Sequence, residues 1–186
     1  MTETRRMTMK PATSTTERAS VAWRKRRVMF TSCVIIVSCA VAIALATPNS
    51  GVLSNVLSRA TFARFHVESQ IASQSGHFEV ELHTTGVTDV VTQTVTLAPG
   101  GYSGWHSHPG PAILSVVSGT LTFYEAVDRT CTPHVFPNGT GFVEPGGDVH
   151  IARNESTENL TVNVTYIIPQ NAPQRIDQPS PGNCPF

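Results

Sequence analysis

Short runs of alternating hydrophobic and polar residues, separated by glycine and proline, fill most of the chain after residue 75. In the run HFEVELHTT, the apolar residues Phe78, Val80 and Leu82 alternate with polar or charged ones. Six further runs follow: VVTQTVTLAP, AILSVV, TLTFYEAV, GFVEP, HIARN and NLTVNVTYIIP. Alternation with a period of two, bounded by turn residues, predicts β-strands. No helical periodicity of useful length interrupts these runs, so the pattern predicts an all-β sandwich or barrel over residues 76–168.

A long hydrophobic run stands near the N-terminus. VMFTSCVIIVSCAVAIALA, residues 28–46, has nineteen residues without a charge and follows the basic cluster Arg24–Arg27. A helix of this length nearly spans a bilayer core of about 30 Å, and the basic cluster keeps its own end in the cytoplasm. The sequence therefore predicts one N-terminal transmembrane or signal helix, with everything after Ala46 exported.

Two fates of this segment stay open. Ala44-Leu45-Ala46 fits the small-x-small pattern of a signal cleavage site, whereas the long basic region and the long apolar run are typical of an uncleaved anchor. The domain is therefore expected either outside the cell membrane on an anchor, or secreted or periplasmic after cleavage. A buried helix of a soluble protein is a poorer interpretation, because a long uncharged run behind four basic residues is a poor globular helix.

The flanking segments differ in composition. Residues 1–27 are rich in Thr, Ser, Arg and Met and poor in large apolar residues, which predicts a disordered basic tail in the cytoplasm. Residues 47–75 are expected to be a linker with a short helix over SNVLSRATFARF. Residues 169–186 hold five of the thirteen prolines and are expected to wrap the surface in an extended conformation.

Charge divides the chain at the same place as hydropathy. Residues 1–27 hold eight basic and two acidic residues, whereas the part from Thr47 onward holds five Arg, no Lys and eleven acids. The two parts cancel to a formal net charge of zero. An acidic domain without lysine is a poor partner for nucleic acid, and the chain has no Gly-rich phosphate loop or nucleophile elbow. We therefore expect no nucleic-acid partner.

Cysteine usage agrees with export. Cys33 and Cys39 lie inside the apolar run, which leaves Cys131 and Cys184 in the exported part. Two cysteines in an oxidising compartment most often pair, so a disulfide between these two is predicted. It would tie the proline-rich end to an earlier loop. Two unrelated thiols are the alternative.

Three of the seven histidines stand in a pattern that suggests chemistry. His106 and His108 follow a Pro-Gly-Gly turn at i and i+2, so their side chains share one face of a strand. His150 follows a second Pro-Gly-Gly turn, which would bring a third imidazole back across the sheet. The other four stand alone and are expected to have structural or solvated roles. They are His66, His77, His83 and His134.

The two motifs around these histidines resemble those of the cupin superfamily. That family's first motif is glycine, five residues, His-x-His, three or four residues, Glu, six residues and glycine. Its spacings are met here by Gly100, His106, His108 and Gly119. The second motif is glycine, five residues, Pro-x-Gly, two residues, His, three residues and Asn. It is matched in full by Gly139, Pro145, Gly147, His150 and Asn154.

The resemblance implies a cupin-type jelly-roll β-barrel with a divalent transition metal inside it. It also implies that His106, His108 and His150 are the metal ligands. The Glu of the first motif is missing, because position 112 is Ala and the other allowed position, 113, is Ile. Three neutral imidazoles are still sufficient to hold Fe, Mn, Zn, Cu or Ni. The missing carboxylate would leave an open position for oxygen or a small anionic ligand.

Other residues near the motifs are candidates for the surroundings of the metal. Asn154 would hydrogen-bond near the third histidine, and Tyr102 and Tyr124 would line the barrel, although aromatic residues on strands are more often plain core. Glu125 and Glu144 are acids close to the motifs. Strand alternation and turn position favour a solvated surface role for both over replacement of the missing ligand.

Three kinds of function are compatible with this sequence. The first is a metal-dependent enzyme, such as a dioxygenase or isomerase, that acts on a small molecule. The second is a non-catalytic module that binds a small-molecule ligand, and the third is an envelope protein in which the barrel is only a stable scaffold. An uncleaved N-terminal helix would attach any of them to the membrane. A homodimer is a further expectation, because cupins often pair through edge strands.

Overall fold

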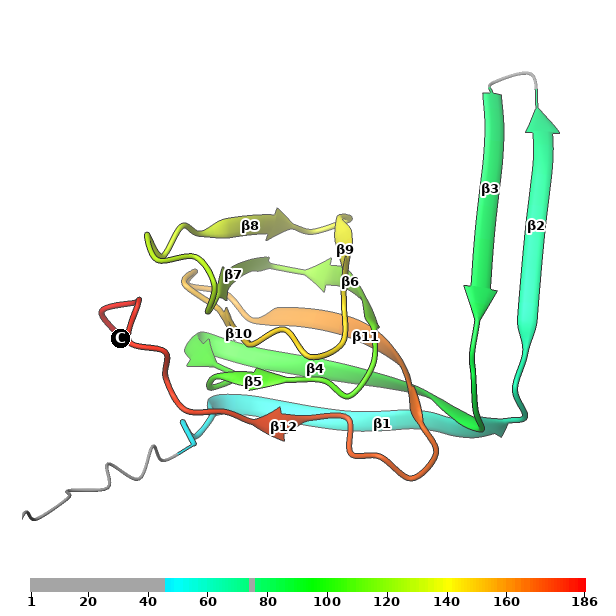
Figure 1. Cartoon of the computed structure of the whole chain (residues 1–186). Helices are drawn as coiled ribbons and strands as arrows, with labels where there is room; N and C mark the ends of the chain where they lie inside the picture. The colour runs from blue at the N-terminus through cyan, green and yellow to red at the C-terminus, as the bar shows by residue number, and fades with distance from the viewer. Residues whose placement is uncertain (1–45, 74–75) are drawn as a thin grey trace, which may run out of the picture. The chain divides into compact units, whose positions relative to one another are not determined.

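The computed structural model describes residues 46–73 and 76–186, and the regular structure of this part is entirely β (Figure 1). No helix in the described part is long and apolar enough to cross a membrane. The predicted basic tail and, apart from Ala46, the predicted transmembrane or signal helix lie outside the described residues. The all-β prediction for the domain is confirmed.

Ten of the described strands form one sheet that curls into a nearly closed barrel (Figure 1). The ten are β1 (Ser50–Phe62), β4 (Thr88–Tyr102), β5 (His106–Ser107), β6 (Ala112–Ser118), β7 (Thr120–Glu125), β8 (His134–Pro137), β9 (Gly141–Glu144), β10 (His150–Arg153), β11 (Leu160–Pro169) and β12 (Ile176–Asp177). Their order is β12-β5-β10-β4-β11-β6-β9, with β1 beside β4, β7 beside β10 and β8 beside β7. This antiparallel order brings β5 and β10, which are far apart in sequence, next to each other.

The core of the barrel follows from alternation along its long strands. In β11 every second side chain, from Leu160 to Ile168, is buried. The neighbouring strand β4 contributes Val91 and Leu97, which are at most 1% exposed. Burying one such aliphatic side chain stabilises the fold by about 1.5–3 kcal/mol. The interior of the barrel is therefore largely apolar, and any polar group inside it needs a partner.

The segment that we expected to be a linker with a short helix contains strand β1. It pairs antiparallel with β4, from Ser50 opposite Tyr102 to Phe62 opposite Thr88. The helix prediction was wrong because the apolar face of SNVLSRATFARF was weak, whereas the edge of β4 offers backbone groups that only another strand can pair with. The barrel sheet therefore begins inside the predicted linker.

The run HFEVELHTT forms a strand, as predicted, but outside the barrel sheet. It supplies β3 (Gly76–His83), which pairs with β2 (His66–Ser73) in a separate two-stranded sheet (Figure 1). Val67 and Leu82 lie opposite each other in this hairpin and are 51% and 41% exposed. Period-two alternation predicts which residues share a face but does not identify the neighbouring strand. The prediction of this run as a barrel strand was therefore wrong.

The C-terminal segment is fastened to the barrel at several points. Strand β12 pairs with β5, and Ala46 forms an isolated bridge with Pro179. The predicted disulfide is present between Cys131 and Cys184, whose Cα atoms are 5.2 Å apart. The segment contains little regular structure, as its proline content predicts. Its strand pairing nevertheless makes it part of the barrel sheet.

Candidate metal centre

The barrel brings together the three histidines that the motifs single out. His106 is the first residue of β5, and His108 lies one residue beyond the end of that strand. His150 begins β10 and is the direct pairing partner of His106. All three side chains are buried, and one nitrogen from each lies within 4.8 Å of the others. The antiparallel pairing of β5 with β10 thus places three imidazoles around one point.

Each of these imidazoles is oriented by a backbone carbonyl at its Nδ1 atom. The carbonyls belong to Gly104 for His106 (2.9 Å), Gln174 for His108 (2.5 Å) and Asp148 for His150 (3.0 Å). A carbonyl oxygen can only accept a hydrogen bond, so the geometry favours the tautomer with the proton on Nδ1. The Nε2 lone pairs of all three rings are then available to a shared ligand.

Burial keeps two of the rings neutral near physiological pH. It lowers the pKa of His106 well below its usual value, and the neighbouring His150, Arg175 and His108 act in the same direction. Burial also lowers the pKa of His150, although the carboxylate of Glu144 partly opposes this shift. A neutral imidazole is the form that binds a metal ion.

Glu144 lies against the histidines, so the prediction of a solvated surface role for it was wrong. Its side chain is 5% exposed, and its Oε2 atom is 3.2 Å from Nε2 of His108 and 3.5 Å from Nε2 of His150. That oxygen is buried and has no hydrogen-bond partner among the residues that the structure describes. The side chain faces inward because β9 pairs with β6 and places Glu144 opposite Ala112, whose side chain is also buried.

The second acid near the motifs behaves differently. Glu125 is 43% exposed, and its Oε2 atom lies 3.6 Å from Nε2 of His134, which is also largely exposed. Both residues stand at the edge of a separate pocket of about 130 Å³ that reaches Glu144 and His150 from the side of β8 and β9. Glu125 and His134 therefore have the surface positions that we expected for them.

The donor set fits a divalent transition metal. Three imidazoles and the carboxylate of Glu144 line one inner cavity of about 60 Å³. When nitrogen lone pairs and a carboxylate oxygen face each other with no cation or proton between them, they repel one another. Imidazole and carboxylate are ordinary protein ligands of such metals, and an ion placed among them would satisfy every one of these atoms.

An outer pocket of about 380 Å³ opens onto two of these histidines. Its lining includes His106, His108, Gln93, Tyr166 and Arg175. The ring of Tyr166 lies 5.1 Å from that of His108, and burial raises the pKa of Tyr166, so its hydroxyl keeps its proton. The pocket therefore offers a hydrogen-bond donor and a positive charge beside the histidine cluster.

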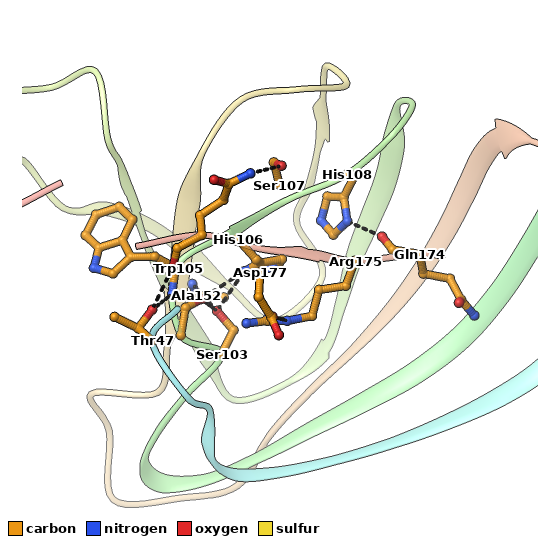
Figure 2. A network of polar contacts seen from close by, with 12 residues as sticks. Thr47, Ser103, Trp105, His106, Ser107, His108, Ala152, Gln174, Arg175 and Asp177 are labelled. Atoms are coloured by element: carbon orange, nitrogen blue, oxygen red, sulfur yellow. Dashed lines mark hydrogen bonds and ion pairs between the residues drawn. The ribbon is translucent and has the colours of Figure 1, made fainter. Parts of the chain in front are cut away.

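Residues 173–178, here called the C-terminal strap, contribute to the site from the far end of the chain. Figure 2 shows the carbonyl of Gln174 beside His108, and Arg175 beside Asp177, with which it forms an ion pair. The side-chain amide of Gln178 donates to Ser107 Oγ at 3.1 Å. The strap thus holds one histidine in place and carries the positive charge of the pocket.

Sequence reasoning missed three contributors to the site. Tyr166 had a usable signal, because NLTVNVTYIIP alternates and places it on the same face as Val162 and Val164. Gln174 and Arg175 had none, because they lie in an irregular proline-rich segment whose path depends on pairing with β5.

The two tyrosines proposed for the surroundings of the metal lie elsewhere. Tyr124 donates its hydroxyl proton to the carboxylate of Glu155 at 3.0 Å. Tyr102 lies under the guanidinium of Arg153, 5.6 Å from ring centre to carbon. Both belong to a small cluster around Trp105, and in the described part of the chain neither lines the inner cavity or the outer pocket at the histidines.

Asn154 is fully buried but serves the fold instead of the histidines. Its amide nitrogen donates to the carbonyls of Leu97 at 2.9 Å and Glu158 at 2.7 Å. Its amide oxygen accepts from the backbone nitrogen and hydroxyl of Ser156. These bonds close the loop between β10 and β11 onto β4, so Asn154 positions the strand that begins with His150 through the backbone.

Comparison with known families agrees with this geometry. Residues 93–179, somewhat less than half of the chain, match the Cupin domain family. This part of the chain is similar to the cupin domain family. It spans every strand from within β4 to β12 and includes all three histidines and Glu144. No curated protein matches the chain.

Solved structures with a similar course of the chain have low TM-scores. An uncharacterized conserved protein with a double-stranded beta-helix domain from Klebsiella pneumoniae is 21% identical, with a TM-score of 0.41, over 60% of this chain and 83% of that one. A Cupin 2 conserved barrel domain protein from Salinispora arenicola is 21% identical, with a TM-score of 0.38, over 44% and 64%. An oxalate oxidase is 28% identical, with a TM-score of 0.39, over 44% and 43%. The matches cover less than two thirds of the last two chains.

Proposed function

We propose that this protein binds one divalent transition metal ion through His106, His108 and His150 and acts as a small-molecule oxygenase or a related metalloenzyme. The observation that carries the proposal is the orientation of the three buried rings. Each Nδ1 faces a backbone carbonyl, which leaves three Nε2 lone pairs directed to one point. A purely structural histidine cluster has no need for three rings held in the same tautomer.

The pocket beside the histidines favours a small anionic substrate. A bound metal would supply Lewis-acid or redox chemistry at the histidine cluster. Arg175 attracts an anion toward that point, and the protonated hydroxyl of Tyr166 is available to donate a hydrogen bond to it. The volume of about 380 Å³ lies in the range of pockets that hold small molecules.

The test is to offer short mono- and dicarboxylic acids to the metal-loaded full chain in air. We expect one or more of them to bind and to be consumed, followed by NMR of the acid and by an oxygen electrode. His106→Ala should abolish both signals. If no acid binds, the anionic substrate class is wrong.

A non-catalytic ligand-binding protein is the second candidate, and the same outer pocket supports it. In that case an acid binds to the metal-loaded chain without being consumed. A barrel that binds neither metal nor small acid would instead favour a structural envelope protein. The experiment above therefore separates all three kinds of function.

We further propose that the barrel is exported, either on an uncleaved membrane helix at residues 28–46 or free after cleavage. The Cys131–Cys184 disulfide supports this, because disulfides persist in oxidising compartments and are rare in the cytosol. Protease added to intact cells or spheroplasts should digest the domain, whereas a cytosolic control protein survives.

We also propose a homodimer, which the exposed side chains of β1 support. Sedimentation of the purified chain tests this proposal.

A further inference from the structure

We propose that Glu144 is the fourth protein ligand of the metal and takes the place of the missing first-motif glutamate. The inference rests on the proposed metal binding by the three histidines and deepens it. Position 112, where the motif carries Glu, is Ala in this chain. The carboxylate is supplied instead by β9, the strand paired with β6.

Strand pairing explains how a residue so far away in sequence can replace position 112. Ala112 of β6 and Glu144 of β9 are direct antiparallel partners. Directly opposite residues point to the same face of a sheet, with Cβ atoms about 4.5–5.5 Å apart. Ala112 is fully buried and small, so it leaves room in the interior that the longer side chain of Glu144 occupies.

The turn after β9 fixes Glu144 beside His108. Gly147 donates its backbone N–H to the carbonyl of His108 at 2.8 Å. Gly146 packs against the backbone of Gly110, and a Cβ at Gly146 would lie only 2.8 Å from the Gly110 Cα. The second-motif turn is therefore docked on the chain that follows the first-motif histidines. This docking brings the carboxylate to 3.2 Å from His108 Nε2.

The unpaired oxygen of Glu144 indicates a missing cationic partner. Its Oε2 atom is buried, accepts no hydrogen bond from residues 46–73 or 76–186, and faces the Nε2 atoms of His108 and His150. A buried carboxylate without a partner is costly. A divalent ion bound to the histidines would neutralise it, and the three-nitrogen, one-oxygen set would extend the site's preference toward Mn²⁺ and Fe²⁺. An ion pair between Glu144 and a protonated histidine is the alternative to exclude.

The experiment measures Mn²⁺ and Zn²⁺ binding by the full chain with titration calorimetry, and the Mn²⁺ environment with electron paramagnetic resonance. Glu144→Gln should weaken Mn²⁺ binding by about 100-fold or more and Zn²⁺ binding less, because the lost ligand is a hard oxygen. Glu125→Gln is the matched control at an exposed acid and should bind both ions like the natural chain.

A double variant tests the relocation itself. Ala112→Glu with Glu144→Ala returns the carboxylate to the first-motif position and should restore Mn²⁺ affinity to within about tenfold of the natural chain. Without metal, Glu144→Gln should unfold at the same temperature as the natural chain or higher, because it removes an unpaired buried charge. This measurement separates loss of a ligand from loss of the fold.

Three results would overturn the inference. If the natural chain and Glu144→Gln bind Mn²⁺ equally, Glu144 is not a ligand although the histidine site stands. If Glu144→Gln lowers the unfolding temperature of the metal-free chain, the carboxylate is paired with a protonated histidine. If the natural chain binds neither ion, the proposed function fails, and this inference fails with it.

Discussion

At the residue scale, buried polar side chains of the barrel fall into two groups with different partners. The histidines and Glu144 face one another across an inner cavity. The side chain of Asn154 instead forms hydrogen bonds with β4 and with the loop that follows β10. Burial alone therefore does not identify the site. The difference is whether the polar atoms already have partners within the fold.

Replacing Asn154 should damage stability and leave metal binding nearly intact. Asn154→Ala leaves the carbonyls of Leu97 and Glu158 without their side-chain donor, which should lower the free energy of unfolding by about 2–4 kcal/mol. Urea unfolding measures this loss, and metal content per folded chain should stay the same. Asn159→Ala, at an exposed neighbour, should change neither. Loss of metal at full stability would show that Asn154 acts on the site directly.

Replacing Arg175 should weaken the binding of a small anion. Arg175→Gln removes the positive charge of the outer pocket, so the Kd or KM for a short carboxylic acid should rise by about 10- to 100-fold. Metal content should not fall, because the charge of Arg175 disfavours a second positive charge at His106, and its removal therefore does not disfavour a bound cation. The control is Arg64→Gln, at an exposed arginine of the segment before β2. An unchanged affinity in Arg175→Gln would exclude an anionic ligand in this pocket.

The three histidines were predictable from sequence because their spacing carries the information. His-x-His places two rings on one side of the backbone, and a second glycine-rich motif repeats the arrangement for His150. Glu144 was not predictable in the same way, because its contact with the site depends on which residue of β6 it faces. The register between β6 and β9 cannot be deduced from a single sequence.

At the element scale, the same limit explains what was right and wrong in the fold. Alternation identified the strands of the barrel, but it did not show that HFEVELHTT pairs in a separate hairpin. The segment before this hairpin, in which we expected a short helix, forms strand β1 instead, because an edge of β4 was available for pairing. The C-terminal strap was expected only to cover the surface. Its pairing with β5 makes it part of the site.

Removing the disulfide should loosen the strap and weaken the metal site together. Cys131 and Cys184 are separated by 53 positions, and closing a loop of that length stabilises the folded chain by about 4 kcal/mol in the entropic model. We expect Cys131→Ser with Cys184→Ser to lower the unfolding temperature and the metal affinity, because the strap carries the carbonyl that orients His108. Calorimetry measures both quantities. Metal affinity equal to that of the natural chain would contradict a role for the strap.

The contact between β1 and β4 around Asp89, here called the joint, should contribute less to the stability of the fold in acid. Asp89 accepts hydrogen bonds from Thr61 Oγ1, the backbone of Asn171 and Arg59, which lower its pKa below 3.8. A lowered pKa in the folded state means that its stabilisation is present above pH 3.8 and is lost as the pH falls below it.

Asp89→Asn tests this assignment through the pH dependence of unfolding. The variant should be less stable than the natural chain at pH 7 and should lose less stability between about pH 4 and pH 2. Glu158→Gln, at an exposed acid, should follow the natural chain throughout. Parallel Tm curves for Asp89→Asn and the natural chain would show that this carboxylate does not stabilise the joint.

At the scale of the whole molecule, the described part contains a nearly closed β-barrel in which three buried histidines converge on one point. The two motifs and the strap come from separate parts of the sequence, and each contributes residues around that point. The barrel class and the three histidines followed from sequence, because strand alternation and motif spacing are local. The outer pocket is built by β1, β4, β11 and the strap, and local sequence patterns do not describe it.

The most direct test of the account is elemental analysis of the full chain, purified without chelator and without a nickel column. His150→Ala and His134→Ala are measured beside it. We predict close to one transition metal ion per chain in the natural protein and in His134→Ala, and almost none in His150→Ala, because His150 belongs to the three-histidine centre and His134 does not. No metal in any sample after reconstitution with Mn²⁺, Fe²⁺ or Zn²⁺, or equal metal in all three, would contradict it.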